Sequence, residues 1–193
     1  MRKILVLAAV LGLLVAAGCG GSSSSSSKSS SAPAKETTPP GDIPDTQAFV
    51  AYKPPSGGFV VKVPEGWARQ TKAGVTTFAS NLNSVAVQGT PAKGQITPAQ
   101  ARTTLVPQLA KSVPGFRLVR VDMLPRPAGT ALHLVYQSSS TPNQVTGKRT
   151  VQTVERYIFF KNGREAILTL TGAKGADNVD PWKTVSSSLR WSA

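Results

Sequence analysis

The sequence predicts an α+β domain in which an antiparallel β-sheet is sandwiched between helices. Short segments with an apolar residue at every second position alternate with turn residues, drawn from the 17 Gly and 15 Pro of this 193-residue chain. Asn162-Gly163 separates two such segments and is typical of the type I′ turn that joins antiparallel strands. The segment 129–138 is apolar on both faces. A strand of this kind must be covered on both faces, which favours a sheet between helical layers.

The expected strands follow one another at short spacing, with one helical region among them. In the strand 116–123, Val119, Val121 and Met123 are expected to share one face. Trp67 directly follows the first strand, and it is expected either to cover the core or, as the alternative, to stack on a ligand. The expected strands are 59–63, 75–80, 84–90, 116–123, 129–138, 148–160 and 164–171.

A helix is expected from Thr97 to about Val113. Thr97 is a suitable N-cap, Pro98 fits the first helical position, and Gln100 completes a capping box. Pro107 lacks a backbone N–H group and is therefore expected to kink or split the helix. The apolar stripe of this helix consists of Ala101, Leu105, Leu109 and Val113.

A second helix is expected near the C-terminus as the cover of the other sheet face. Asp180 is its expected cap and Pro181 its first residue, with Trp182 and Val185 on the buried side.

Residues 1–18 are expected to be the signal peptide of a bacterial lipoprotein. Arg2 and Lys3 precede an apolar run of about a dozen residues, whereas roughly 20 would be needed to span a bilayer. The run ends in Ala16-Ala17-Gly18-Cys19, which resembles a lipobox with Ala in place of the commoner Leu. Cys19, the only cysteine, is the expected lipidation site, where acyl chains such as palmitate would hold the protein on the membrane. The alternative is an ordinary secretory signal with an incidental cysteine.

Residues 19–50 are expected to comprise the lipidated cysteine and a Ser/Pro-rich disordered tether, and residues 51–193 the folded domain. Ser22 to Ser27 are uninterrupted serines, a composition that buries too little apolar surface to order the backbone. The segment from Ile43 to Tyr52 regains hydrophobic character and is expected to lie against the domain as an N-terminal arm.

The formal net charge of +13 favours anionic neighbours. For a protein on the extracytoplasmic face of the cell membrane, the expected partners are the membrane itself, through the lipid anchor, and an envelope protein or anionic polymer. No nucleic acid is expected there, and the chain is expected to be a monomer. Four basic residues are expected to gather at adjacent strand ends as a surface for anionic contacts, the alternative being a solvated edge. These are Lys148, Arg149, Lys161 and Arg164.

The sequence shows no catalytic or cofactor-binding motif, so no enzymatic activity and no cofactor are expected. His133 is the only histidine and lies within an apolar strand, where a buried, hydrogen-bonded ring is expected rather than a catalytic base. One histidine with scattered acidic residues does not suggest a metal site.

Residues 58–67, with the pattern Gly-Phe, alternating apolar residues and Pro-Glu-Gly-Trp, together with 182–189, resemble the PsbP-like fold. That fold is shared by photosystem extrinsic subunits, a Ran-binding nuclear import factor of the Mog type and LpqN-type lipoproteins of actinobacteria. The resemblance covers about Tyr52 to Trp191. It implies an α/β/α arrangement in a protein that acts by docking on others, and it transfers no functional residue.

Two functions follow as hypotheses. The first is a non-enzymatic binding or assembly factor anchored to the membrane. The second is a carrier of a hydrophobic or lipid-like ligand, suggested by the bulky apolar residues Trp67, Phe159, Phe160 and Trp182.

Overall fold

The computed structural model describes residues 41–192, so the predicted signal peptide, Cys19 and most of the predicted tether lie outside the described residues.

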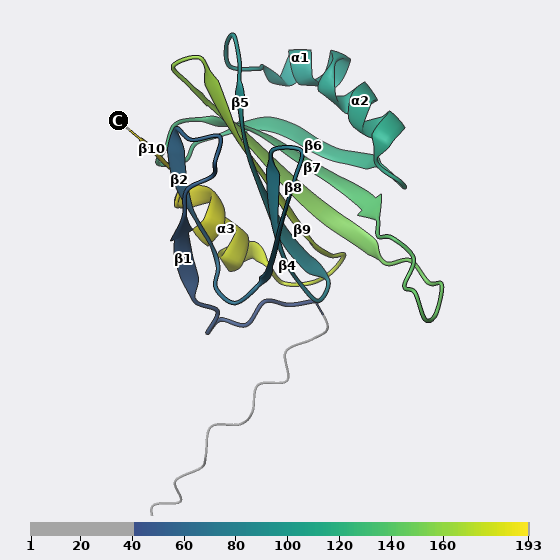
Figure 1. Cartoon of the computed structure of the whole chain (residues 1–193). Coiled ribbons are helices and arrows are strands. Elements are labelled where there is room, and N and C mark those ends of the chain that lie inside the picture. Colours follow the sequence, from purple (N-terminus) through teal and green to yellow (C-terminus); the bar gives the residue numbers. More distant parts are fainter. Residues whose placement is uncertain (1–40, 193) are drawn as a thin grey trace, which may run out of the picture. The chain divides into compact units, whose positions relative to one another are not determined.

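The described chain forms a seven-stranded sheet in the order β3-β4-β5-β9-β8-β7-β6 and a three-stranded sheet in the order β1-β2-β10 (Figure 1). The large sheet consists of β3 (Ala68–Lys72), β4 (Val75–Ser80), β5 (Asn83–Pro91), β6 (Arg117–Leu124), β7 (Ala131–Ser139), β8 (Val151–Lys161) and β9 (Arg164–Ala173). The small sheet consists of β1 (Phe49–Tyr52), β2 (Phe59–Pro64) and β10 (Arg190–Trp191). The helices are α1 (Pro98–Thr103), α2 (Leu105–Ser112) and α3 (Val179–Ser187).

The α+β class and the antiparallel pairing are confirmed, since every strand pair in both sheets is antiparallel. Three strands were not expected from the sequence: β1, β3 and β10. All five residues of β3 are exposed and four of them are polar or charged, so this edge strand has no apolar alternation to reveal it.

The large sheet carries a hydrophobic core on each face, because alternate residues of its strands point to opposite sides. Leu168 and Leu170 of β9 belong to the α3-side core, which also contains Trp182 of α3 and Phe59 of β2. Ile167 belongs to the other core, the α1–α2-side core. One face is therefore covered by α3 together with the small sheet, so a simple layering of helices on both faces does not describe this fold.

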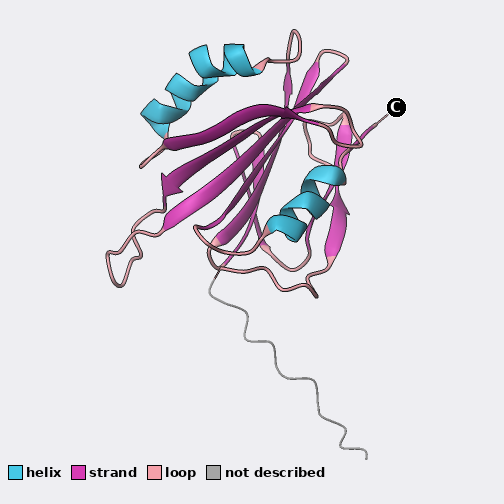
Figure 2. Cartoon of the chain, turned by 180° about the vertical axis from the view of Figure 1, so that it is seen from behind, coloured by secondary structure: helices cyan, strands magenta, loops and turns pink. Residues whose placement is uncertain are grey.

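The α1–α2 segment covers only part of its face. Figures 1 and 2 show it beside the β6 edge of the large sheet, away from β3 and β4. Its buried residues, Ala101 and Leu109, pack with residues of β6, β7 and β8 such as Val121. On β9, Ile167 still belongs to this core, whereas Thr169, Thr171 and the residues of β5 on the same face are only half-buried.

The predicted capping box at the start of α1 is confirmed. The hydroxyl of Thr97 accepts from the backbone N–H of Gln100 at 3.3 Å, and the Gln100 side chain accepts from the Thr97 backbone at 2.9 Å. The predicted break is also present, at Thr104 between the two helices. Because Pro107 has no N–H group, it cannot donate to the carbonyl of Thr103, and the helical ladder is interrupted there.

The expectation that Val119 shares a face with Val121 and Met123 is wrong. The pairing of β6 with β7 shifts between Leu118 and Arg120, which makes Val119 the extra residue of a β-bulge and leaves it 58% exposed. A bulge places two residues opposite one and so reverses the side-chain alternation beyond it. Arg120 consequently lies on the same face as His133.

The expectation that Asp180 caps α3 is also wrong. The residue at the cap position is Asn178, and its side chain makes no capping hydrogen bond. Instead its oxygen accepts from the backbone N–H of Ile43 at 2.8 Å, and its amide nitrogen donates to the Gly41 carbonyl at 3.1 Å and to Asn83 at 3.0 Å.

Residues before position 51, the expected start of the folded domain, already pack against the rest of the described chain. Ile43 is 4% exposed within the α3-side core, and β1 starts at Phe49 and pairs with β2. The arm expected between Ile43 and Tyr52 therefore does lie against the domain, and it contributes a strand.

Candidate functional site

The four basic residues expected to gather do not form one surface. Lys148 and Arg149 precede β8, whereas Lys161 ends it and pairs with Arg164 of β9. The eleven residues of β8 rise by about 3.4 Å each, so the two pairs are separated by more than about 30 Å. The error arose because the sequence places all four next to strand ends without showing which end of the sheet each one occupies.

Two of these four residues are held by contacts within the chain. Arg149 donates to the Ser140 carbonyl and Arg164 to the Ser56 carbonyl, both at 2.8 Å. These bonds brace the long β7–β8 loop and the turn before β2. Lys148 instead lines a surface pocket of about 330 Å³.

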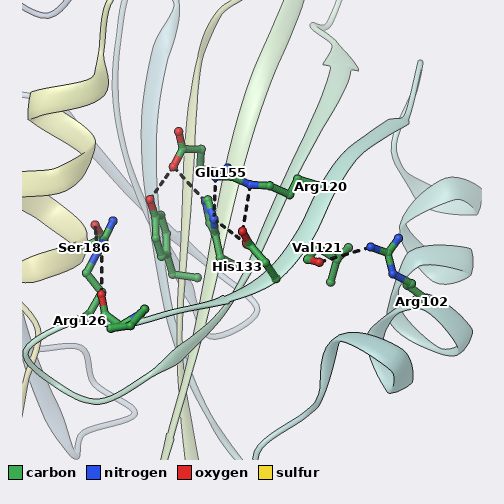
Figure 3. A network of polar contacts seen from close by, with 10 residues as sticks. Arg102, Arg120, Val121, Arg126, His133, Glu155 and Ser186 are labelled. Atoms are coloured by element: carbon green, nitrogen blue, oxygen red, sulfur yellow. Dashed lines mark hydrogen bonds and ion pairs between the residues drawn. The ribbon is translucent and has the colours of Figure 1, made fainter.

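His133 lies at the centre of a network of polar side chains on β6, β7 and β8 (Figure 3). It is 2% exposed, as the sequence led us to expect of a buried ring. Its Nε2 is 3.1 Å from Oε2 of Glu155, and its Nδ1 is 3.2 Å from Oδ1 of Asp122. Arg120 reaches the same ring nitrogen at 3.4 Å and pairs with Asp122 at 3.2 Å.

The ring of Tyr157 stacks on the ring of His133 and restricts its position. The two rings are stacked with centroids 4.5 Å apart, and the Tyr157 hydroxyl donates to Glu155 at 2.5 Å. Arg126 lies over the other face of Tyr157, 5.4 Å from the ring centroid, and donates to Ser186 of α3. The network therefore links the β6 side of the sheet to α3.

The charges in this network shift two pKa values in opposite directions. Burial alone would raise the pKa of Glu155, but the hydrogen bonds from His133 and Tyr157 and the nearby positive charges outweigh it, so the pKa lies below its usual value. Burial, followed by the hydrogen bond to Glu155 and its negative charge, raises the pKa of Tyr157 to about 12. Glu155 is therefore a carboxylate at neutral pH and Tyr157 a neutral donor.

This arrangement suits a structural role for His133. Both ring nitrogens face carboxylates and the ring is closed off by Tyr157, so no nitrogen is free to exchange a proton with a bound molecule. Within residues 41–192, no group of three or more His, Cys, Asp or Glu side chains has a geometry that could hold a metal ion.

Arg156 is a residue that the sequence analysis missed. It lies on β8 between Val154 and Ile158, which both belong to the α1–α2-side core, so all three point to the same face. Its guanidinium makes no ion pair within 4.0 Å with any carboxylate of residues 41–192, and its Nε is buried without a hydrogen-bond partner. The sequence could have indicated this residue, because an arginine stands among apolar residues on one face of a predicted strand.

The sheet surface beside Arg156 is polar and half-exposed. We call it the polar face, made of Ser84, Ala86 and Gln88 of β5 and Thr169 and Thr171 of β9. On the opposite face of the same two strands, Val85, Val87, Leu168 and Leu170 are fully buried. Arg156 pairs directly with Thr169, which places it at the border between the polar face and the helices.

A pocket lies at each end of the polar face. The pocket lined by Lys148 is also lined by Ser84 and Gln152. Most of its other side chains are amides and hydroxyls of the β4–β5 turn and the β7–β8 loop. The other, of about 750 Å³, lies between α1 and Glu165 of β9. Burial raises the pKa of Glu165, and the charge of Arg156 opposes that rise. Conversely, burial lowers the pKa of Arg156 while Tyr136 and Glu165 oppose the decrease.

The part of the chain that the structure describes contains no helix long and apolar enough to cross a bilayer.

Neither a protein-family model nor a curated protein sequence matches this chain. The structure is similar to cyanobacterial PsbP (CyanoP) from Synechocystis, with a TM-score of 0.56 at 14% identity over 79% of this chain and 98% of that one. It also matches the Ran-binding protein Mog1p of Saccharomyces cerevisiae, with a TM-score of 0.49 at 10% identity over 75% and 96% of the two chains. A third match is LpqN, involved in cell envelope biogenesis of Mycobacterium tuberculosis, with a TM-score of 0.42 at 14% identity over 77% and 93%. The likeness to CyanoP supports the expected PsbP-like fold and bears on the fold alone.

Proposed function

We propose that this protein is a lipid-anchored binding or assembly factor on the extracytoplasmic face of a bacterial cell membrane, and that it acts without catalysis. The proposed location rests on the N-terminal sequence pattern. This pattern begins with Arg2 and Lys3, continues with a short apolar run and ends with Ala16-Ala17-Gly18 directly before Cys19. A diacylated cysteine would hold the domain on the membrane, and the serine-rich segment after it would act as a flexible spacer.

The absence of catalysis is supported by the geometry around His133. The only histidine of the chain is buried, and its two nitrogens are engaged by Asp122 and Glu155. A general base needs a nitrogen within reach of the substrate, and this ring presents none to the surface. A PsbP-like fold with a broad sheet and few helices serves instead as a rigid platform for docking.

No specific observation favours the hypothesis that the protein carries a hydrophobic ligand. The side chains of Phe159 and Trp182 are packed within the α3-side core, and Trp67 packs against that core while its indole N–H donates to Gln47. Three of the four residues that suggested a lipid-binding cavity therefore contribute to the packing of the core, and the fourth, Phe160, is half-buried at the end of β8. Mass spectrometry of an organic extract of the purified protein tests this hypothesis directly, and stoichiometric lipid would revive it.

The experiment that tests the proposed function is crosslinking in intact membranes. A photoreactive amino acid at an exposed position, such as Val145 of the β7–β8 loop, is expected to capture a defined envelope component in the anchored protein. The same probe in a Cys19→Ser protein is expected to capture much less, since it is no longer held at the membrane. Equal capture by both forms would contradict an anchored role.

A further inference from the structure

Arg156 is a half-buried cation whose Nε is buried without a hydrogen-bond partner, and it forms no ion pair with a carboxylate of residues 41–192. Moving a guanidinium out of water costs several kcal/mol unless an anion or full hydrogen bonding replaces the lost hydration. For Arg156 this replacement is incomplete among residues 41–192: Tyr136 and Glu165 lie close enough to act on it, but its Nε is buried without a partner and no carboxylate lies within 4.0 Å. Arginine does not escape this cost by losing its proton, because its pKa remains far above neutral pH.

The surroundings indicate what could supply the missing anion. Glu165 on the same face is close enough to affect the pKa of Arg156, but it does not form an ion pair with it. The polar face itself carries hydroxyl and amide groups and only small apolar side chains, as Ser84, Ala86, Gln88, Thr169 and Thr171 show. Protein interfaces are instead centred on large aromatic or arginine anchors in apolar pockets. Flat hydroxyl- and amide-rich surfaces suit ligands that are themselves rich in hydroxyl groups.

The length of the face favours an extended ligand. On β9, Ala173 pairs with Gln152 at one pocket, and Glu165 lines the pocket at the other end. Eight residues separate Ala173 from Glu165, which corresponds to about 27 Å of strand. A chain of several sugar units fits this length, with Lys148 near one end and Arg156 between the two pockets.

We infer that the polar face binds an acidic polysaccharide and that Arg156 receives one of its carboxylate groups. The planar guanidinium matches a carboxylate with two parallel hydrogen bonds. The competing ligand is a polymer with a phosphate at every repeat. Glu165 would oppose a second closely spaced anion, while Lys93 in the same pocket partly offsets that repulsion, so the test compares the two polymers directly. This inference deepens the proposed binding role by naming its partner class, and it rests on that function.

The test measures binding of defined oligosaccharides to the full-length protein purified in mild detergent. The probe is a hyaluronan octasaccharide, in which every second sugar carries a carboxylate, and the control ligand is its carboxyl-reduced form. We expect the reduced form to bind at least roughly tenfold more weakly. We also expect Arg156→Gln to weaken binding of the octasaccharide by a similar factor, and Glu165→Gln to strengthen it by removing a competing negative charge.

Arg117→Gln is the matched control, because it removes one positive charge from an exposed position of β6 on the other face of the sheet. It is expected to bind as the wild type does. Arg156→Lys keeps the charge and loses the planar fork, so an intermediate affinity is expected, and it serves as the test variant if Arg156→Gln fails to fold. Wild-type affinity in both Arg156 variants would overturn the inference, as would equal binding of the acidic and reduced sugars.

Two further outcomes would also contradict the inference that the polar face binds an acidic polysaccharide. Preferential binding of poly(glycerol phosphate) would overturn the choice of a carboxylated polymer. A photoreactive residue at Thr169 that captures a protein and no glycan in intact cells would show that the polar face is a protein interface. Failure of glycan binding in purified protein leaves the membrane-crosslinking test of the proposed function unaffected, so the two failures can be told apart.

Discussion

At the scale of single residues, His133 and Arg156 of the large sheet differ in their polar partners. His133 is surrounded by carboxylates, with Glu155 and Asp122 each within 3.2 Å of a ring nitrogen. Arg156, on the other face of the same sheet, has no ion-pair partner among the described residues. The His133 network is paired with carboxylates, although Oδ1 of Asp122 makes no hydrogen bond, whereas a charge without any ion-pair partner costs stability and is therefore a candidate for function.

Glu155→Ala is expected to destabilise the protein by about 2–3 kcal/mol, because it leaves the buried His133 nitrogen and the Tyr157 hydroxyl without their acceptor. Glu155→Gln keeps an acceptor oxygen and should cost about 1 kcal/mol. Urea unfolding of both variants measures the difference. Equal losses would show that the hydrogen bonds at this position contribute little.

The same residue gives stability a pH dependence. The pKa of Glu155 is below its usual 4.5 in the folded protein, so its contribution is fully present above about pH 4.5 and is lost as the pH falls through the folded-state value. Unfolding free energies measured between pH 3 and 7 should therefore fall more steeply in the wild type than in Glu155→Gln. Parallel pH profiles would contradict the assignment.

Arg156→Met is expected to raise the free energy of unfolding by about 1 kcal/mol, because it replaces an unpaired half-buried charge by an apolar side chain of similar length. Arg117→Met, at an exposed strand position, should change it by less than about 0.5 kcal/mol. Thermal and urea unfolding compare the two. A marked loss of stability in Arg156→Met would indicate that the arginine has a structural role.

At the scale of secondary-structure elements, the N-terminal arm is attached through one amide side chain. Asn178 at the start of α3 accepts from the Ile43 backbone and donates to Gly41 and Asn83. The bonds to Ile43 and Gly41 connect segments more than 130 residues apart in the sequence. The arm thus depends on α3 for its position.

Asn178→Asp is expected to destabilise the protein by about 2 kcal/mol or more, since a carboxylate can still accept from Ile43 but cannot donate to the other two oxygens. Limited proteolysis should cut the variant faster within residues 41–48. Asn81→Asp, the same change at an exposed turn, is the control. An arm that stays as resistant as in the wild type would refute this attachment.

The start of α1 permits a second test at this scale. Thr97→Ala removes the hydroxyl of the capping box and should cost about 1 kcal/mol, whereas Thr97→Ser retains it and should be close to neutral. Urea unfolding measures both. Equal stability of the two variants would mean that α1 is held by the packing of Ala101 alone.

At the scale of the whole molecule, the proposed function assigns location to the N-terminal segment and partner binding to the described domain. The N-terminal pattern ending at Cys19 lies outside the described residues, and the described domain carries its charged residues at separate places on the two faces and ends of one sheet. If the proposed function is correct, mutations should separate membrane attachment from partner binding.

Cys19→Ser is expected to remove incorporation of a labelled fatty acid and to move the protein from the membrane fraction to the soluble fraction. The lost acyl chains account for this shift, because each buried methylene contributes about 0.8 kcal/mol to membrane binding. The folded domain should be unaffected, as checked by its thermal unfolding. A wild-type protein that incorporates no label would reject the lipoprotein assignment.

Local rules in the sequence were sufficient for much of the architecture. The Asn162-Gly163 turn has positive φ at both residues, as its composition predicts, and the strand β4 has the expected bounds. The Thr97 capping box and the interruption associated with Pro107 also follow from local chemistry. In each case the physical cause, whether backbone conformation, a missing N–H group or apolar alternation, acts within a few residues.

Other features depended on contacts between distant segments. The bulge at Val119 reverses the side-chain alternation of β6. The side chain of Asn178 binds the N-terminal arm instead of capping α3. The strand β3 forms by pairing with β4. The sequence by itself thus determined the class of fold, the turns, the cap of α1 and the lipoprotein pattern. Only the tertiary structure decided that the four basic residues separate along β8 and that Arg156 faces a polar surface, because strand order and register set which residues meet.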